Sequence, residues 1–423
     1  MTFGKPPPRN PFDHLFSDQP GGGELFRLIT ALGQQQPPPP PPTYMDNELF
    51  RSLASMGQAS AAAKALDVFG LTPLLEPYTP HSAKAVADGL GIADFISLSS
   101  INSAGALARL LEENYRSRRD WNDRFAHWQR PASVSEEGTI ERAAANVRAA
   151  LSASSWLVDQ GLELCQQGSY FNNTNVRRDS DIDLRLVHPA VNVVFGPNVV
   201  PQYARGALGY AAGGRKFGDI FSDMRAHTSA ALAKRFGAAN IVPGSKAIKV
   251  RGITGSRAMV DVVPCVRLHI IDWVSDWSRY ITTEGVAIIG NAGWIYNFPD
   301  LHHRNGKAKR QNTAHRFKRM VRIFKALRDD MEGRGIAGAR VPSFLVECLV
   351  YAVEDGYFLH DEDLYGRVRR IALRMQARLA APDAERTMLE ISGVKHLFQP
   401  GQAWTFAQAR NFMDAVVTHL GNA

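Results

Sequence analysis

The chain has 423 residues, 45% of them hydrophobic and 21% charged, which is the composition of an ordinary soluble globular protein. Its 49 lysines and arginines outnumber the 41 acidic residues and leave a formal net charge of +8. Ten of the basic residues lie between positions 302 and 328, a stretch without an acidic residue, so the rest of the chain holds 39 basic against 41 acidic residues. These values exclude a cationic coat over a whole face and indicate one local site for a polyanion.

Neither a membrane span nor a disulfide framework is predicted. The longest apolar runs are shorter than the roughly 20 residues that a span needs, and the amino terminus lacks a basic segment followed by an apolar one. The three cysteines, Cys165, Cys265 and Cys348, are odd in number and far apart, so a zinc site is not indicated either. We therefore expect a cytoplasmic protein without a membrane partner.

The amino-terminal part is expected to contribute no chemistry. Residues 1–45 are predicted to form a disordered tail, because the first 42 residues hold 11 of the 24 prolines together with a run of three glycines. Residues 46–120 carry apolar residues at helical spacing and are predicted to form a helical extension of unassigned role.

The remainder is predicted to form two lobes with a cleft between them: an α+β lobe at residues 121–290 and a helical lobe at residues 291–423. In the first lobe, Ser133 and Glu136 form a capping-box pattern ahead of a long helix. The elements expected after it are strands at 162–166 and 181–187, an amphipathic helix at 217–236, and a β-hairpin with arms at 246–251 and 258–267.

Three carboxylates are the candidate catalytic residues. Asp181 and Asp183 lie two apart on a predicted strand, so their side chains share a face. Asp261 lies on an otherwise apolar arm of the hairpin, where an unpaired carboxylate would be costly. If that arm lies beside the first strand, the three acids converge, and divalent cations such as Mg²⁺, or Mn²⁺, would make their proximity tolerable. Such a group suits two-metal phosphoryl transfer.

The turn before these acids makes the pattern more specific, since an isolated Asp-x-Asp is common on surface strands. Gly168 permits a close approach of the backbone, and the hydroxyl of Ser169 can hold phosphate oxygens together with nearby amides. Eleven residues separate Ser169 from Asp181, with a strand predicted on each side. The combination therefore favours a nucleotide site.

A cationic helix is predicted at residues 313–331. Lys318, Arg322 and Lys325 lie on one narrow stripe of it, and the helix itself offers them no acidic neighbour. The alternative is a solvated basic face, but the upstream carboxylates favour triphosphate binding by Arg322 and Lys325. The basic residues at 304–310 could instead meet a second nucleotide or a nucleic acid, and that choice stays open.

These motifs resemble those of the bacterial cGAS/DncV-like nucleotidyltransferases of antiphage signalling, members of the polymerase β-like superfamily that includes oligoadenylate synthetase. The resemblance is carried by residues 167–176, which begin Gln-Gly-Ser, and by residues 179–184, which read Asp-Ser-Asp-Ile-Asp-Leu. It extends from residue 121 to the carboxyl terminus, and further matches lie at residues 262–264, 321–325, 341–347, 397–398 and 404–405. The family fold that it implies is a mixed sheet flanked by helices, followed by a helical lobe, with the active site in the cleft between the two.

The resemblance also implies roles for individual residues. Asp181 and Asp183 would each bind both magnesium ions, and Asp261 would be the third ligand and help to deprotonate the acceptor hydroxyl. The donor nucleotide would contact Gln167, Gly168 and Ser169. The implied phosphate contacts are Arg322, Lys325 and Ser343. Phe344 would stack on a base, although core packing is an equally good interpretation of this residue.

The expected activity is the condensation of nucleoside triphosphates (ATP, GTP, UTP or CTP) into a cyclic di- or trinucleotide, with release of pyrophosphate. The product would act through an effector protein that responds to it. Two alternatives remain: addition of nucleotides to RNA or protein, and a catalytically idle nucleotide or RNA sensor on the same fold. The intact aspartates argue against the idle sensor.

Overall fold

The computed structural model describes residues 104–131, 134–176, 182–211, 213–253, 256–274, 279–291 and 293–421. The predicted tail, most of the predicted helical extension, Ser133 and Asp181 lie outside the described residues. The chain divides into two compact units, Met1–Glu113 and Asn114–Ala423. The description below concerns the second unit.

A seven-stranded mixed sheet forms the first part of this unit. Its strand order is β1-β2-β5-β4-β3, and β6 pairs with β5 and in turn with β7. The two long strands β2 and β5 run parallel to each other, whereas the other pairs are antiparallel. The strands are β1 (Glu163–Gln167), β2 (Ile182–Phe195), β3 (Ile241–Pro243), β4 (Ile248–Val250), β5 (Val260–Val274), β6 (Arg279–Gly290) and β7 (Gly293–Asn297).

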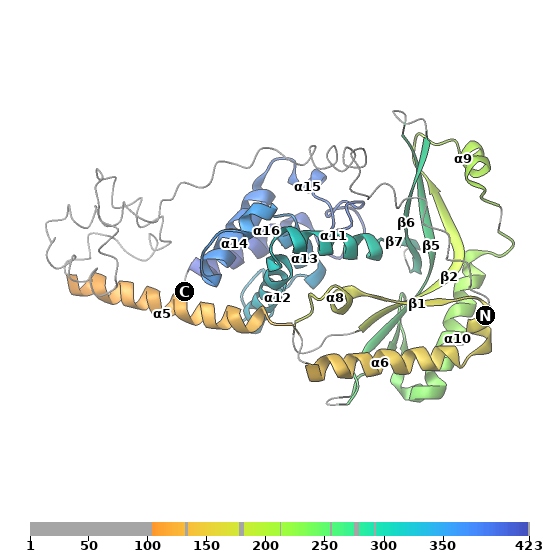
Figure 1. Ribbon diagram of the computed structural model, residues 1–423, viewed down its shortest axis with the longest axis horizontal. Coiled ribbons are helices and arrows are strands. Elements are labelled where there is room, and N and C mark those ends of the chain that lie inside the picture. The colour runs from red at the N-terminus through yellow and green to blue at the C-terminus, as the bar shows by residue number, and fades with distance from the viewer. Residues whose placement is uncertain are drawn as a thin grey trace, which may run out of the picture. The chain divides into compact units, whose positions relative to one another are not determined.

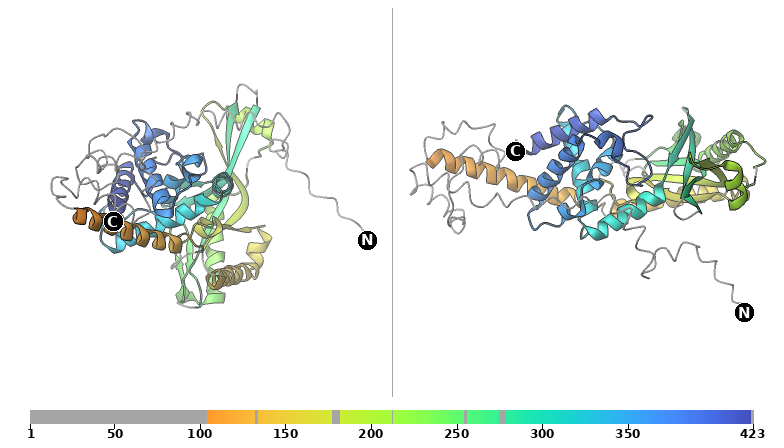
Figure 2. Two further views of the ribbon diagram at one scale, coloured as in Figure 1. Left: turned by 60° about the vertical axis from the view of Figure 1, so that its left-hand side comes forward. Right: turned by 90° about the horizontal axis from the view of Figure 1, so that it is seen from above.

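Helices accompany the sheet and then continue alone to the carboxyl terminus. Figure 1 shows α6 and α10 beside the sheet, and α12 to α16 gathered apart from it. Helix α11 contacts the sheet, since its Asp300 pairs with Arg185 of β2 at 2.6 Å. Figure 2 shows the same separation of the blue helices from the green strands in two further views. The helices are α5 (Ala104–Trp128), α6 (Val134–Ser152), α7 (Ser155–Asp159), α8 (Gly168–Phe171), α9 (Pro201–Leu208), α10 (Phe217–Phe236), α11 (Pro299–Asn312), α12 (Arg316–Gly333), α13 (Ser343–Tyr351), α14 (Leu364–Ala380), α15 (Ala384–Thr387) and α16 (Phe406–Gly421), with 3₁₀ turns at Ala238–Asn240 and Asp355–Phe358.

The alternation of residues along β2 gives the two faces of the sheet different environments. Ile182, Leu184 and Leu186 are buried in a core that they share with residues of α6 and α10. Because successive side chains of a strand point to opposite faces, Asp183 and Arg185 lie on the other face. The apolar positions of β2 therefore dock the sheet on two helices and leave the face with the acids for a site.

A second core holds the helices of the carboxyl-terminal part together. The apolar face of α12 is buried in it, including Phe317 and Phe324, and residues from α13, α14 and α16 pack against this face. The end of α5 contributes Trp121 and Phe125 to the same core. None of the described helices is both long enough and apolar enough to span a membrane.

Most elements predicted from residue 121 onward are present, and the α+β class is confirmed. The hairpin arms correspond to β4 and β5, which pair in antiparallel fashion. Three strands were not predicted, β3, β6 and β7. Strand β7 lies beyond the division that the sequence placed after residue 290, although it pairs with β6.

Asp363 is expected to stabilise this arrangement. Its carboxylate accepts the amide hydrogen of Gly366 at the start of α14 and bonds from Arg118 and Asn122 of α5. Asp363→Ala is therefore predicted to lower the free energy of unfolding by about 1–2 kcal/mol, measured by urea denaturation, mostly through loss of the helix cap. Asp363→Asn, which can still cap the helix, should lose less, and equal stability of all three proteins would contradict the assignment.

The same carboxylate predicts a pH dependence. Burial alone would raise its pKa, but the bonds from Arg118 and Gly366 hold the pKa of Asp363 at about 2, below its ordinary value of 3.8. Because the charged form is favoured in the folded state, the contribution of Asp363 to stability is present above pH 3.8 and is lost as the pH falls toward 2. The difference in free energy of unfolding between wild type and Asp363→Ala should decrease as the pH falls from 3.8 toward 2.

Candidate active site

A row of four polar residues crosses the sheet on the face opposite α6 and α10. Asp183 of β2 lies opposite Gln167 of β1 on one side and opposite Asp261 of β5 on the other. Lys249 of β4 lies opposite Asp261 and completes the row. Directly opposed residues of neighbouring strands share a face, so these side chains project together. The condition on which the acids would converge is met for two of them, because the hairpin arm with Asp261 lies beside the strand of Asp183. Asp181 lies outside the described residues.

Asp261 has the features of a ligand to a cation. Its oxygen Oδ1 is buried and makes no hydrogen bond, and its Oδ2 lies 3.3 Å from Nζ of Lys249. A buried carboxylate oxygen without a partner is costly, and binding of a hard cation would remove that cost. Within the described residues no three His, Cys, Asp or Glu side chains are grouped around one point. Asp183 and Asp261 therefore fit a divalent cation as two of the several ligands that it needs.

The turn between β1 and α8 is packed against Asp183. Gly168 has a φ of +76°, and a Cβ added to it would lie 2.0 Å from Oδ2 of Asp183. Only glycine allows both the left-handed backbone and this close approach. Gln167 directly precedes α8 in extended conformation, and Ser169 follows in its first turn. The three predicted nucleotide contacts of this turn are therefore adjacent to one of the two described acids.

Two members of the predicted cationic stripe on α12 already have partners inside the protein. Lys325 is buried and lies 2.7 Å from Oε2 of Glu347, which comes from α13. Arg322 is buried and donates to the backbone carbonyls of Gln129 and Asn173, at 2.8 and 2.7 Å. Burial, then the neighbouring Arg319 and Arg310, lower the pKa of Arg322 to about 10. The sequence predicted a bound triphosphate as the partner of these two cations. In the structure, other segments of the chain provide their partners.

The other predicted contacts are divided between surface and core. Ser343 is exposed at the first position of α13. Phe344 is half-buried, and its ring lies 5.6 Å from that of His302 and 5.8 Å from that of Trp404. Part of this ring therefore packs in the helical core, as the alternative interpretation expected.

Sequence reasoning missed Lys249 and Glu347. Lys249 lies on a predicted hairpin arm, and counting pairs across that hairpin would have placed it opposite Asp261. Glu347 lies in an apolar run, where a single acidic residue signals a buried partner. Burial would raise the pKa of Glu347, but Lys325 and His302 outweigh that effect and hold it well below the ordinary value.

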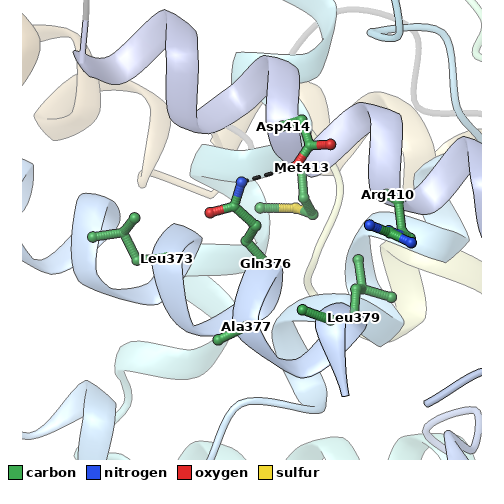
Figure 3. Close-up of a pocket in the computed structure, with 8 residues that line it drawn as sticks. Leu373, Gln376, Ala377, Leu379, Arg410, Met413 and Asp414 are labelled. Atoms are coloured by element: carbon green, nitrogen blue, oxygen red, sulfur yellow. Dashed lines mark hydrogen bonds between the residues drawn. The ribbon is translucent and has the colours of Figure 1, made fainter. Parts of the chain in front are cut away.

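A pocket of about 270 Å³ lies away from these residues, in the helical part. Figure 3 shows it between α14 and α16, where Gln376 donates to Oδ1 of Asp414 at 2.8 Å across the groove. Its other lining residues are Leu373, Ala377, Leu379, Ala380, Arg410 and Met413. None of the predicted site residues lines it, so it belongs to a different surface.

The family model of the cGAS/DncV-like nucleotidyltransferase C-terminal helical domain matches residues 304–421. A cyclic dipyrimidine nucleotide synthase from Legionella pneumophila is 31% identical over 296 residues, which cover 70% of this chain and 96% of that protein. A second such synthase, from Cecembia lonarensis, is 30% identical over 70% of this chain and 97% of its own length.

A solved structure shows the same architecture. The Elizabethkingia meningoseptica cyclic dinucleotide synthase, determined with GTP and a nucleotide named Apcpp, has a TM-score of 0.56 at 26% identity and covers 71% of this chain and 98% of its own. The polymerase β-like sheet with a carboxyl-terminal helical lobe is thereby confirmed. Over most of its length the chain belongs to the cGAS/DncV-like nucleotidyltransferases and is an enzyme of that family.

Proposed function

We propose that this enzyme condenses nucleoside triphosphates into a cyclic di- or trinucleotide, releasing pyrophosphate, in a magnesium-dependent reaction. The observation that carries the proposal is the register of Asp183 and Asp261 on neighbouring strands, with Gly168 packed against the first. Two carboxylates on one face of the sheet, one of them with a buried oxygen lacking a partner, suit phosphoryl transfer between nucleotides.

The chain's own residues would bind the metal ion, orient the nucleotide and accept a proton. Asp183 and Asp261, with Asp181, would hold Mg²⁺, which when bound neutralises the charge of the phosphates. Asp261, the third acid of the set, would also help to take the proton of the acceptor hydroxyl. Gln167 and Ser169 would hold the donor nucleotide beside these acids. Ser343 and Phe344 remain proposed contacts for its triphosphate and base.

The relatives suggest the class of product but not the bases. Their names include cyclic dipyrimidine and cyclic dipurine synthases and a cyclic UMP-AMP synthase. We therefore propose a cyclic nucleotide signal made from two or three of the common triphosphates, acting on an effector protein in bacterial antiphage defence of the CBASS type. The choice of bases would depend on residues outside the row formed by Gln167, Asp183, Asp261 and Lys249.

The proposal is tested by pyrophosphate release from a mixture of four nucleoside triphosphates, with Mg²⁺ or with a chelator. Release with Mg²⁺ and without any added acceptor is expected, because both reacting groups come from nucleotides. If release required added RNA or a protein acceptor, the enzyme would instead be a transferase to that polymer.

A further inference from the structure

A buried polar network links Thr174, which lies three residues after the end of α8, to the helical part of the protein. At its centre, Oε2 of Glu347 accepts from Lys325 at 2.7 Å and from Oγ1 of Thr174 at 2.9 Å. Its other oxygen, Oε1, lies 3.1 Å from Nε2 of His302 on α11. Thr174 is fully buried, and Glu347 and Lys325 each expose only 3% of their surface. Groups from two helices, α12 and α13, therefore meet the hydroxyl of Thr174, and His302 of α11 supports Glu347 from its other side.

Thr174 connects this network to the predicted nucleotide-binding turn. Its amide donates to the carbonyl oxygen of Ser169 at 2.9 Å, while its hydroxyl donates to Glu347 and accepts from Lys325 at 3.3 Å. Ser169 follows Gly168, whose backbone lies against Asp183. A displacement of Thr174 would thus be passed through one hydrogen bond to the turn beside the acids.

A second set of bonds fixes the residue before Thr174. Asn173 has a φ of +54°, a left-handed conformation that needs support in a residue other than glycine. Arg322 donates to its carbonyl oxygen at 2.7 Å, and His303 lies 3.1 Å from the side-chain oxygen of Asn172. The rings of Phe171 and His303 also stack at 4.1 Å. Residues 171–174 are therefore held at four consecutive positions by α11, α12 and α13.

Stability alone does not account for this arrangement. Buried ion pairs often contribute little to stability compared with apolar residues of the same volume, because burial removes the hydration of both charges. The helical part contains a second ion pair with a buried lysine, Lys309 with the partly exposed Asp355 at 2.6 Å. Lys309 also donates to the carbonyl oxygen of Val353 at 2.7 Å, so it is held inside the fold and is not bonded to residues 168–174. What distinguishes Lys325 and Glu347 is their shared contact with the hydroxyl of Thr174. This contact favours a role in positioning the Gly168–Ser169 turn.

We propose that Thr174 and Glu347, with Lys325, are positioning residues that set the Gly168–Ser169 turn against Asp183 for nucleotide transfer. The effect that we expect on kcat rests on the proposed function. In this proposal Lys325 acts indirectly, through Glu347 and Thr174. An indirect role fits its burial better than a direct contact with phosphate.

The test compares Thr174→Val, which keeps the shape but removes the hydroxyl, with Thr174→Ser, which restores it. Thr174→Val should lower kcat about 10- to 100-fold, since a misplaced reacting group costs this much, with KM changed far less. Thr174→Ser should stay within about threefold of wild type. Lys309→Met, which breaks the pair that does not touch the turn, should lower the melting temperature but leave kcat near that of wild type. If Thr174→Val does not fold, Glu347→Gln takes its place in the same comparison.

Hydrogen exchange gives a readout that needs no nucleotide. Amides in a peptide covering residues 168–176 should exchange faster in Thr174→Val than in wild type or Lys309→Met. If the wild-type enzyme formed no cyclic product, the proposed function would fail, while the exchange comparison would still decide the positioning role. Unchanged exchange together with unchanged kcat in Thr174→Val, or equal losses in the Val and Ser variants, would overturn the proposal.

Discussion

Replacing Asp183 with asparagine is expected to abolish synthesis of the nucleotide product while the fold stays intact. The change keeps the size of the side chain but removes one of two carboxylates that lie opposite each other on β2 and β5. A cation site that loses a charged ligand no longer neutralises the phosphates, so the rate should fall by about 1,000-fold or more, equivalent to ~4 kcal/mol. Asp261→Asn should show a loss of the same order, since its oxygen Oδ1 is buried without a partner.

The measurement is the initial rate of pyrophosphate release, with the melting temperature recorded for each variant. Asp219→Asn is the matched control, because this carboxylate is exposed on α10, the helix packed against the opposite face of the sheet. Its rate should equal that of wild type. Retention of full activity by either Asp183→Asn or Asp261→Asn would remove the acidic pair from the reaction.

Gly168→Ala is expected to produce the second largest loss. The new methyl group would lie 2.0 Å from Oδ2 of Asp183, so the carboxylate or the turn must move by about 1 Å, and a displacement of this size costs about 10- to 100-fold in rate. The left-handed backbone adds a conformational cost of about 1–2 kcal/mol in stability.

Gly161→Ala separates these two effects. Gly161 has a φ of +66°, close to that of Gly168, but a Cβ added there meets no atom within 4 Å. Both variants should therefore lose the stability that the left-handed backbone costs, measured by urea denaturation, and only Gly168→Ala should also lose activity. Equal rates for the two alanine variants would show that the packing of the turn on Asp183 is irrelevant to the reaction.

The sequence places Asp183 and Asp261 each on a strand because that information is local. Alternation of polar and apolar residues sets the face of Asp183, and the apolar neighbours of Asp261 mark a buried strand. Parallel pairing of β2 with β5 then brings the two acids into register. The turn at Gly168 is likewise a local signal, because the glycine is needed for both its backbone conformation and its close contact.

The partners of the basic residues could not be predicted in the same way. Glu347 is 22 residues from Lys325 and lies on another helix, so spacing along α12 gives no sign of it. Arg322 is bound by the carbonyls of Gln129 and Asn173, which are 193 and 149 residues away. Tertiary packing supplies these contacts. A charge count identifies an excess of basic residues but not which of them are already neutralised inside the fold.

The most direct test of the proposed activity is mass analysis of the products formed from all four nucleoside triphosphates with Mg²⁺, after phosphatase treatment. Linear products carry a terminal phosphate that the phosphatase removes, whereas a cyclic product has none. We predict a phosphatase-resistant species with the mass of a cyclic di- or trinucleotide from the wild-type enzyme, and none from Asp183→Asn. A wild-type reaction that yields only linear oligonucleotides or unreacted triphosphates would contradict the account.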